Sequence, residues 1–177
     1  MRIAILSDTH FPARGTELPE ACRVVVGRCD LVIHAGDLAD LTTLRLLEDL
    51  GRPFVAVHGN ADDDDVRRAL PASAEVDLPG LTLAVVHNGG PESGRLGRLR
   101  KRFPDAGGVV FGHSHIPLHQ ADPDGFFILN PGSATDRRRQ PRHSMVELTI
   151  RRGRPPNVAF LAVDEPAGAL PDELVRR

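Results

Sequence analysis

The sequence predicts an α/β fold organised around a parallel β-sheet, and two observations lead to this prediction. Over residues 2–60, short apolar runs alternate with amphipathic segments in the order strand, helix, strand, helix, strand. Parallel strands joined by crossover helices require this order. Five apolar runs along the chain also end at a side chain that could bind a metal ion. Because ligands bind at the carboxyl ends of parallel strands, we expect these five strands to converge on one polar site.

The first half of the chain alternates strands and helices. Strands are assigned from short apolar runs, and helices from apolar residues that recur every three or four positions. The first helix carries such a stripe through Leu18, Cys22, Val25, Val26 and Cys29. The predicted elements are a strand over 2–7, a helix capped at or near Thr16, a strand over 31–35, a helix over 41–50 closed by Gly51, and a strand that begins at Pro53.

The second half begins with four consecutive acidic residues, 62–65. We interpret this run as leading into a short helix over 66–70. Carboxylates stabilise the positive amino end of a helix, and Arg67 and Arg68 stabilise its negative carboxyl end. From residue 109 onward, strands are linked by turns. The further predicted elements are a strand over 81–86, a helix over 91–103, strands over 109–111, 118–121 and 126–129, and a final strand pair over 145–150 and 157–163.

Length and composition limit the classes of function. A chain of 177 residues fits one domain. We place this domain at residues 1–163, followed by a C-terminal tail over 164–177 that is loose or forms a short helix. The net charge of −2 gives no general reason to expect binding to nucleic acid or to a membrane. No apolar run reaches the roughly 18 residues that span a bilayer, and no cleavable signal precedes the first strand, so we expect a cytoplasmic protein that begins at Met1.

Seven side chains at or near the strand ends are candidate metal ligands. They comprise two carboxylates, one amide and four imidazoles: Asp8, His10, Asp37, Asn60, His87, His113 and His115. Oxygen and imidazole donors without a thiolate suit a pair of divalent transition ions such as manganese, iron or zinc. A carboxylate can bridge two ions, and Asp37 is the candidate for that position. Glycine precedes three of the ligands, where it permits a tight turn.

With these motifs, from Asp8 to the turn over residues 130–133, the chain resembles the calcineurin-like metallophosphoesterases, in particular their small single-domain bacterial and archaeal phosphodiesterase branch. The resemblance implies a four-layer αββα sandwich of two mixed β-sheets flanked by helices, with a dinuclear metal site between the loops. It implies one ion held by Asp8, His10, Asp37 and His115. It implies a second ion held by Asp37, Asn60, His87 and His113.

The resemblance also implies a hydrolase that cleaves phosphate esters, in which a hydroxide bridging two divalent ions attacks phosphorus. Manganese is the predicted ion, with iron, zinc and nickel as alternatives, and the predicted catalytic residues are Asn60, His10 and Asp37. Many members carry His directly after the Asn of the Gly-Asn motif, where it can protonate the leaving oxygen, but this chain has Ala61. General-acid help worth typically about 10²- to 10⁴-fold is then missing. We therefore expect a phosphodiesterase that hydrolyses aryl phosphodiesters faster than alkyl phosphomonoesters.

Several other polar residues have a structural interpretation beside a functional one. His34 lies three residues before Asp37, on the opposite face of a regular strand, so we interpret it as a core residue or one that supports a ligand. His58 could share a face with Asn60 and support it. The remaining interpretations are a substrate contact or a structural turn for Asn130 and Ser133, a surface position for His119 and His143, and an altered ligand loop at Asn88, where the family usually has Gly.

Two other functions remain as alternatives within the same fold. The retromer subunit of this fold uses it for protein contacts after losing some of the metal ligands, so a metal-binding interaction scaffold is one alternative. A nuclease is the other, with phosphate contacts from the arginines of 95–102 and 137–142. Nucleic acid ranks lower because seven Phe and no Trp or Tyr leave few rings for base stacking. A protein phosphatase ranks lower still. The predicted partner is a small phosphodiester, with a homo-oligomer left open and no membrane.

Overall fold

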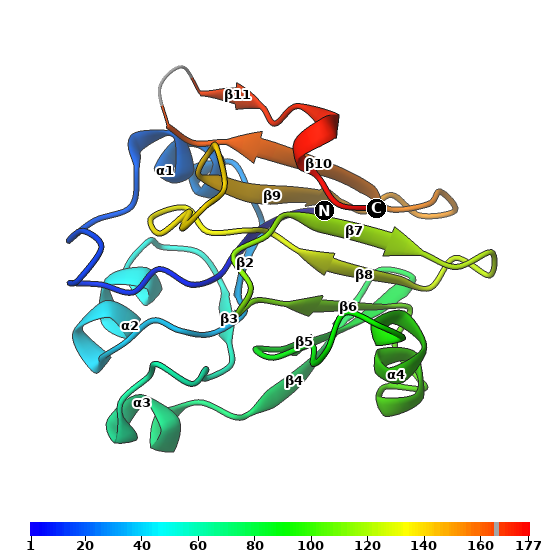
Figure 1. Cartoon of the computed structure of the whole chain (residues 1–177), viewed down its shortest axis with the longest axis horizontal. Helices are drawn as coiled ribbons and strands as arrows, with labels where there is room; N and C mark the ends of the chain where they lie inside the picture. The colour runs from blue at the N-terminus through cyan, green and yellow to red at the C-terminus, as the bar shows by residue number, and fades with distance from the viewer. Residues whose placement is uncertain (165–166) are drawn as a thin grey trace.

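The computed structural model describes residues 1–164 and 167–177, which form two β-sheets packed face to face (Figure 1). The first sheet contains, in spatial order, β11 (Gly168–Ala169), β10 (Asn157–Ala162), β9 (Ser144–Thr149), β1 (Arg2–Leu6), β2 (Leu31–His34) and β3 (Phe54–Ala56). The second contains β4 (Ser73–Leu78), β5 (Leu81–Val86), β6 (Gly108–Phe111), β8 (Phe127–Asn130) and β7 (Leu118–Ala121). Both sheets are mixed, because β1, β2 and β3 are parallel, as are β5, β6 and β8, whereas the other pairs are antiparallel.

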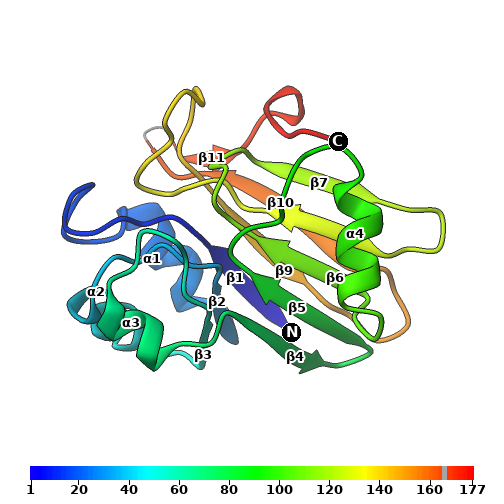
Figure 2. The ribbon, with the colours of Figure 1, turned by 60° about the horizontal axis from the view of Figure 1, so that its bottom comes forward.

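Helices cover the outer faces of both sheets (Figure 2). The described α-helices are α1 (Glu20–Gly27), α2 (Leu41–Glu48), α3 (Asp64–Ala69) and α4 (Arg95–Arg102). Side chains of β1 alternate between two apolar clusters, with Ile3 and Ile5 between the sheets and Ala4 and Leu6 under α1, α2 and α3. A third cluster joins the second sheet to α4. These three clusters fill the spaces between the layers of an αββα sandwich, which confirms the predicted fold class.

The helices begin where the local sequence supplies a cap or a break. The carboxylate of Asp40 accepts the N–H of Thr43 at the start of α2, as an N-cap does. The prediction of a cap at or near Thr16 is wrong, because α1 begins at Glu20 after Pro19. A residue before proline is disfavoured in helical conformation, so the helix cannot include Leu18. No described helix exceeds eight residues, and none in this part of the chain could cross a membrane.

The edge strand β4 was not predicted from the sequence. It pairs antiparallel with β5 across the turn at Pro79 and Gly80. Within it, three apolar residues that alternate with polar ones join the cluster between the sheets: Ala74, Val76 and Leu78. This alternation, followed by a Pro-Gly turn and a second apolar run, is typical of a β-hairpin, so the sequence carried the signal.

The described part of the C-terminal tail packs against both sheets. β11 adds to β10 of the first sheet, and a short 3₁₀ helix follows at Asp172–Leu174. Leu170 and Val175 are buried. The N–H of Arg176 then donates to the carbonyl of Pro117 next to β7 of the second sheet. The loose alternative for the tail is therefore wrong for the residues described, and a short helix is present.

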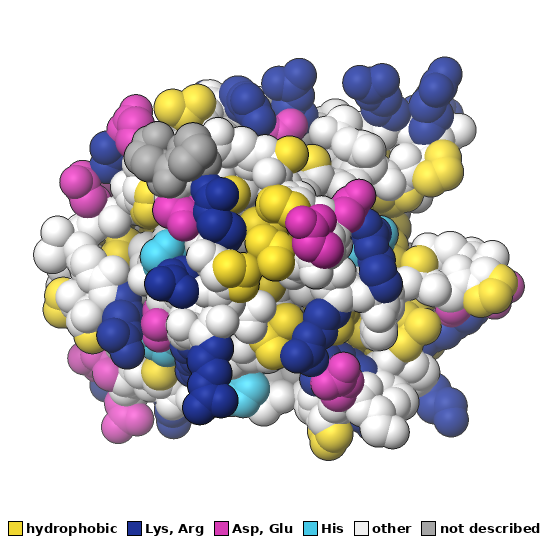
Figure 3. All heavy atoms as spheres, turned by 45° about the horizontal axis from the view of Figure 1, so that its top comes forward, with side chains coloured by type: hydrophobic (Ala, Val, Ile, Leu, Met, Phe, Trp, Pro, Cys, Tyr) yellow, Lys and Arg dark blue, Asp and Glu magenta, His cyan; other side chains and the backbone are white. Residues whose placement is uncertain are grey.

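On the face shown in Figure 3, basic side chains lie in separate groups, with acidic side chains between several of them. Many of the arginines on α4 are engaged locally. Arg95 lies 5.0 Å from the ring of Phe111 and donates to the carbonyl of Gly90, and Arg100 pairs with Asp122. This arrangement resembles the solvated helix face that we preferred over a nucleic-acid surface.

Candidate metal centre

Parallel strands of both sheets end at one edge of the sandwich and position the candidate ligands there. In the first sheet β1, β2 and β3 are parallel neighbours, and in the second β5 and β6 are. Each of these strands is followed within five residues by at least one predicted ligand. The residues they deliver are Asp8 and His10 after β1, Asp37 after β2, Asn60 after β3, His87 after β5, and His113 and His115 after β6.

The first group of ligand atoms belongs to Asp8, His10 and His115, and these atoms all lie within 4.8 Å of one another. Nε2 of His115 lies 3.3 Å from Nε2 of His10 and 3.3 Å from Oδ1 of Asp8. The two imidazole rings are stacked, with centroids 5.2 Å apart. Asp8 and His115 are buried, whereas His10 is only half-buried. One side of this group is therefore open to solvent.

The second group belongs to Asp37, His87 and His113, again with ligand atoms within 4.8 Å. Nε2 of His87 lies 3.3 Å from Oδ2 of Asp37 and 3.1 Å from Oδ1 of Asn60. The same Oδ2 of Asp37 lies 3.7 Å from Nε2 of His10 in the first group. Asp37 thus stands between the two groups, where a bridging carboxylate would lie.

Backbone carbonyls fix the orientation of two of the imidazoles. Nδ1 of His87 donates to the carbonyl of Ala35 at 2.8 Å, and Nδ1 of His115 donates to the carbonyl of Asp136. When Nδ1 carries the hydrogen of a neutral imidazole, the lone pair is at Nε2. In both residues Nε2 is the atom that faces the carboxylates. Partners of this kind commonly orient histidines that bind metals.

The electrostatics favour an ionised Asp37 beside neutral imidazoles at His10 and His113. Burial opposes ionisation of Asp37, but the hydrogen bond and charge of His87, together with the N–H of Ala61, lower its pKa to about 2. Burial lowers the pKa of His10 and of His113. Burial also acts against protonation of His87, yet its bond to Asp37 and the nearby carboxylates raise its pKa. Metal binding requires ionised carboxylates and neutral imidazoles, and the pKa shifts of Asp37, His10 and His113 act in that direction.

The donor set fits divalent cations. Asp8 and Asp37 are 0% and 1% exposed, and no Lys or Arg pairs with either of them within the described residues. Buried carboxylates are costly unless they are paired or coordinate a metal. Nδ1 of His113 is also buried and has no hydrogen-bond partner among the described residues. Two buried anions and an unused imidazole nitrogen are features that a pair of divalent ions would satisfy.

The backbone around the ligands adopts unusual conformations. Five of the predicted ligands have φ angles of 50° to 68°: Asp8, His10, Asp37, His113 and His115. Such angles are uncommon outside glycine and cluster at functional sites. Gly59 is needed for space, because a Cβ there would collide with the Asp37 carboxylate. Gly112 is needed for the same reason, since a Cβ would lie 2.8 Å from Oδ2 of Asp8.

Asp62 is a functional residue that the sequence interpretation missed. It was assigned with the acidic run to the helix that follows, but it is 4% exposed and lies before α3. Its carboxylate accepts N–H groups from Asp37, Ala39 and Gly59 at 3.1, 2.7 and 2.6 Å. It therefore joins the loop after β2 to the loop after β3, and these two loops carry Asp37 and Asn60. The sequence offered no signal that distinguishes Asp62 from the three acidic residues that follow it.

The turn residues have structural roles. Asn130 and Ser133 are 0% and 1% exposed. The Asn130 amide donates to the carbonyl of Gly112, and the Ser133 hydroxyl donates to the carbonyl of Asp8. They hold the ligand loops in place, so the structural alternative describes them better than a substrate contact.

The other histidines behave differently from one another. His34 is fully buried, and its Nδ1 accepts the N–H of Gly36 at 3.2 Å in the loop before Asp37. His58 is half-buried, and the nearest described hydrogen-bond partner of its imidazole is the carbonyl of its own neighbour Gly59, at the limiting distance of 3.5 Å. His119 and His143 lie at the surface, as expected, but neither is fully exposed. Both are half-buried, because His119 packs edge-on against a phenylalanine ring and His143 lies 3.9 Å from a carboxylate of the adjoining loop.

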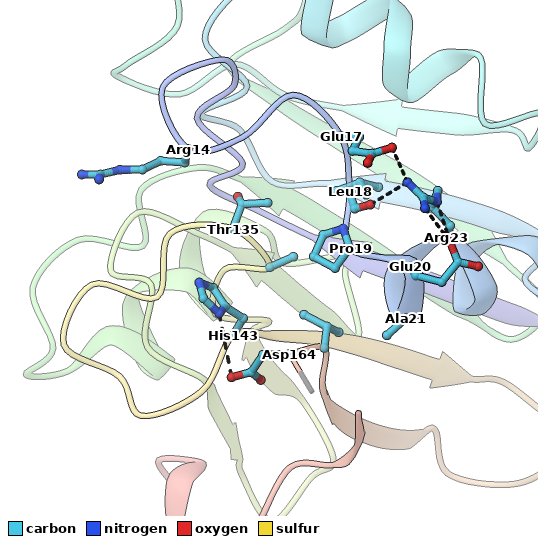
Figure 4. Close-up of a pocket in the computed structure, with 12 residues that line it drawn as sticks. Arg14, Glu17, Leu18, Pro19, Glu20, Ala21, Arg23, Thr135, His143 and Asp164 are labelled. Carbon is cyan, nitrogen blue, oxygen red and sulfur yellow. Dashed lines mark hydrogen bonds and ion pairs between the residues drawn. The ribbon is translucent and has the colours of Figure 1, made fainter. Parts of the chain in front are cut away.

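Two pockets differ in their relation to the candidate centre. The larger, of about 560 Å³, is lined in part by His143 and Asp164 but by none of the seven candidate ligands. Figure 4 shows that its charged groups are largely paired, with Arg23 bonded to Glu17 and Glu20. A smaller pocket of about 380 Å³ is lined in part by Asn60 and His87 of the second ligand group. The smaller pocket therefore adjoins the candidate metal centre.

Comparison with known proteins agrees with this geometry. Residues 1–153 match the model of the calcineurin-like phosphoesterase superfamily domain. The chain belongs to this superfamily. This finding confirms the resemblance drawn from the ligand motifs. The chain is 34% identical over 154 residues to a probable metallophosphoesterase of Methanocaldococcus jannaschii, a match that covers 85% of this chain and 76% of that protein.

Two solved structures extend the comparison. The solution structure of a Thermotoga maritima protein is 32% identical and has a TM-score of 0.69, with 96% of this chain and 99% of that chain covered. Vps29 from Entamoeba histolytica, solved in complex with zinc, has a TM-score of 0.80 at 22% identity, with 96% and 97% covered. The second likeness shows a shared fold.

Proposed function

We propose that the protein is a phosphodiesterase that depends on two divalent metal ions, with manganese as the favoured ion. Membership of the phosphoesterase superfamily supports a hydrolase of phosphate esters. The observation that carries the proposal is the position of Asp37, whose Oδ2 lies 3.3 Å from His87 of one ligand group and 3.7 Å from His10 of the other. One carboxylate between two sets of imidazoles is the arrangement that a dinuclear site needs.

The proposed roles divide among the ligands. The first ion would be held by Asp8, His10, Asp37 and His115, and the second by Asp37, Asn60, His87 and His113. Bound ions of this kind act as Lewis acids toward phosphate oxygens and lower the pKa of bound water. The protein orients the set: Ala35 and Asp136 fix two imidazoles through their carbonyls. Asn60 is exposed, so its amide group can also donate a hydrogen bond to a phosphate oxygen.

Ala61 supports the preference for activated diesters. Its N–H donates to Oδ1 of Asp37 at 2.7 Å, so its backbone contributes to the site while its methyl side chain cannot transfer a proton. A phenolate leaves without protonation more readily than an alkoxide does. We therefore expect aryl phosphodiesters to be better substrates than alkyl phosphomonoesters, by at least about tenfold.

The test is hydrolysis of bis(p-nitrophenyl) phosphate and of glycerol 2-phosphate by metal-stripped protein, with Mn²⁺, Ni²⁺, Zn²⁺ or Mg²⁺ added back. Asp37→Asn should lose metal binding and turnover together. Asn tolerates the positive φ of this position, and circular dichroism would verify the fold. Asp64→Asn, on the exposed face of α3, is the matched control and should behave as wild type. An Asp37→Asn variant that binds two ions and turns over substrate would falsify the assignment of Asp37. Equal rates on the two substrates would contradict the predicted preference for aryl phosphodiesters.

An interaction scaffold is the second candidate, favoured by the likeness to Vps29. In that case the protein would bind ions stoichiometrically but hydrolyse neither substrate with any of the four metals. The complete set of seven ligands favours the enzyme. A location in the cytoplasm stays a prediction under either function.

A further inference from the structure

The pocket beside the second ligand group is lined mainly by polar and basic side chains from several elements. It encloses about 380 Å³ and lies between the start of β4, the end of β5 and the side chains of α3 and α4. Its lining is His58, Gly59, Asn60, Arg67, Ala72, Val86, His87, Asn88 and Arg102. Two ligands from the candidate centre thus form part of its wall, so a substrate with its phosphate at the centre can extend into it.

The pocket is positively charged. Arg67 comes from α3 and Arg102 from the end of α4, and the lining contains no carboxylate. Arg67 donates to the backbone carbonyl of Asn60 at 2.7 Å, which holds its guanidinium at the wall. Neither arginine forms an ion pair with any of the described residues. Their helix neighbours do, since Arg68 pairs with Asp65 and Arg100 pairs with Asp122.

The lining also limits what the anion is attached to. No aromatic ring lines this pocket apart from imidazoles, so a nucleobase would find no large face on which to stack. Imidazole and amide groups at His58, Asn60 and Asn88 can instead bond hydroxyl groups. The volume lies near the lower end of the range for small-molecule sites. These properties fit a short polyhydroxylated carrier that bears a phosphate.

We propose that this pocket binds a second phosphate of the substrate, so that the natural substrate is a phosphodiester of a phosphorylated sugar or polyol. The inference rests on the proposed function, because it assigns the first phosphate to the metal centre. Arg102 provides an exposed charge with no ion-pair partner among the described residues, and its guanidinium lies 5.0 Å from the ring of Phe103. Arg67 provides a fixed charge beside Asn60. Guanidinium groups of this kind recognise phosphate through paired N–H donors.

The activity test compares two substrates that differ only in the second phosphate: the p-nitrophenyl phosphodiester of glycerol, and the same diester with a phosphate on the terminal hydroxyl. Wild-type protein should favour the second compound at least tenfold in kcat/KM. Arg102→Gln should reduce that preference to about twofold or less through a higher KM. Arg100→Gln and Arg68→Gln, which alter paired arginines on the same helices, should keep it. A wild-type protein without the preference, or an Arg102→Gln variant that retains it, would overturn the inference.

A binding test on the metal-free protein separates the pocket from the reaction. Ribose 5-phosphate should shift the backbone amide resonances of Gly59, Ala72 and Asn88, ribose should not, and Arg102→Gln should weaken the binding about tenfold. Inorganic phosphate that binds as tightly as ribose 5-phosphate would overturn the assignment to a sugar phosphate. Binding that depends on Arg102 without hydrolysis of bis(p-nitrophenyl) phosphate would support the pocket and reject the phosphodiesterase. Hydrolysis of that compound without a preference for the second phosphate would reject the pocket alone.

Discussion

At the residue scale, one carboxylate organises the two loops that carry Asp37 and Asn60. Asp62 is buried and accepts three backbone N–H groups, from residues 37, 39 and 59. A carboxylate is suited to this position because it has two oxygens and no hydrogen to donate. Asp62 does not belong to either ligand group, and so it acts by holding the ligand loops in register.

The substitution Asp62→Asn should separate this role from an ordinary surface charge. The amide keeps one acceptor but turns a donor toward the backbone N–H groups, so the free energy of unfolding should fall by about 1–3 kcal/mol. The affinity for divalent ions should fall by about 10- to 100-fold. Denaturant unfolding in a chelator and metal titration measure the two effects. Unchanged metal affinity in a folded variant would contradict the role.

Most of the candidate site could be predicted at this scale, and Asp62 shows why the rest could not. The seven candidate ligands follow apolar runs whose ends must meet in a parallel sheet, so the strand pattern locates them. Asp62 stands among four acidic residues whose composition suits a helix start, and local sequence cannot tell them apart. Only the fold brings the N–H groups of two separate loops to one of the four carboxylates.

At the element scale, the acidic residues at the start of α3 have different roles. Asp63 is the N-cap, and its carboxylate accepts the N–H of Val66 at 2.8 Å. Asp64 and Asp65 lie in the first turn, and Arg67 and Arg68 in the last. The predicted arrangement, with acidic residues at the amino end of the helix and arginines at its carboxyl end, is therefore present. This short helix carries Arg67 to the pocket beside the second ligand group.

Asp63→Ala should destabilise the protein without removing the metal ligands. Loss of an N-cap costs about 1 kcal/mol, which chemical denaturation would detect as a lower midpoint with an unchanged slope. Asp64→Ala, which removes a first-turn charge without a capping bond, should change the free energy of unfolding by less than about 0.5 kcal/mol. Equal losses in the two variants would mean that charge, and not the capping bond, stabilises α3.

The fold was predictable where an element buries a long apolar stripe and less so at its edges. β2 is buried throughout and β1 is buried from Ile3 onward, and their apolar runs identify them. β4 lies at a sheet edge, where only Leu78 is buried and Ala74 and Val76 are half-buried, so its apolar pattern is weaker. The start of α1 depends on Pro19, whose restriction of Leu18 outweighs the capping tendency of Thr16.

At the scale of the whole molecule, each ligand group draws on both sheets. Asp8 and His10 follow β1 of the first sheet, whereas His115 follows β6 of the second. Asp37 follows β2 of the first sheet, whereas His87 follows β5 of the second. Ions held in this way would connect the two halves of the sandwich.

Metal binding should therefore raise the thermal stability of the whole domain. At a free ion concentration of about 100 times Kd, linkage adds about 2.7 kcal/mol. For a chain of this size that corresponds to a Tm increase of about 5–10 °C. Differential scanning calorimetry with Mn²⁺ and with a chelator measures the change. The shift should disappear in Asp37→Asn, and a shift of equal size in that variant would place the ions elsewhere.

The last residues of the chain close the open side of the second sheet. β7 is an edge strand, and unpaired edge backbone can recruit a strand from another molecule. Here the N–H of His119 donates to the carbonyl of Arg176, and the side chain of Gln120 donates to the carbonyl of Arg177. The C-terminal segment thus occupies part of the edge that a second copy would need for strand-to-strand polymerisation. A tag fused after Arg177 would start at this edge, and it should not displace the C-terminal segment from β7.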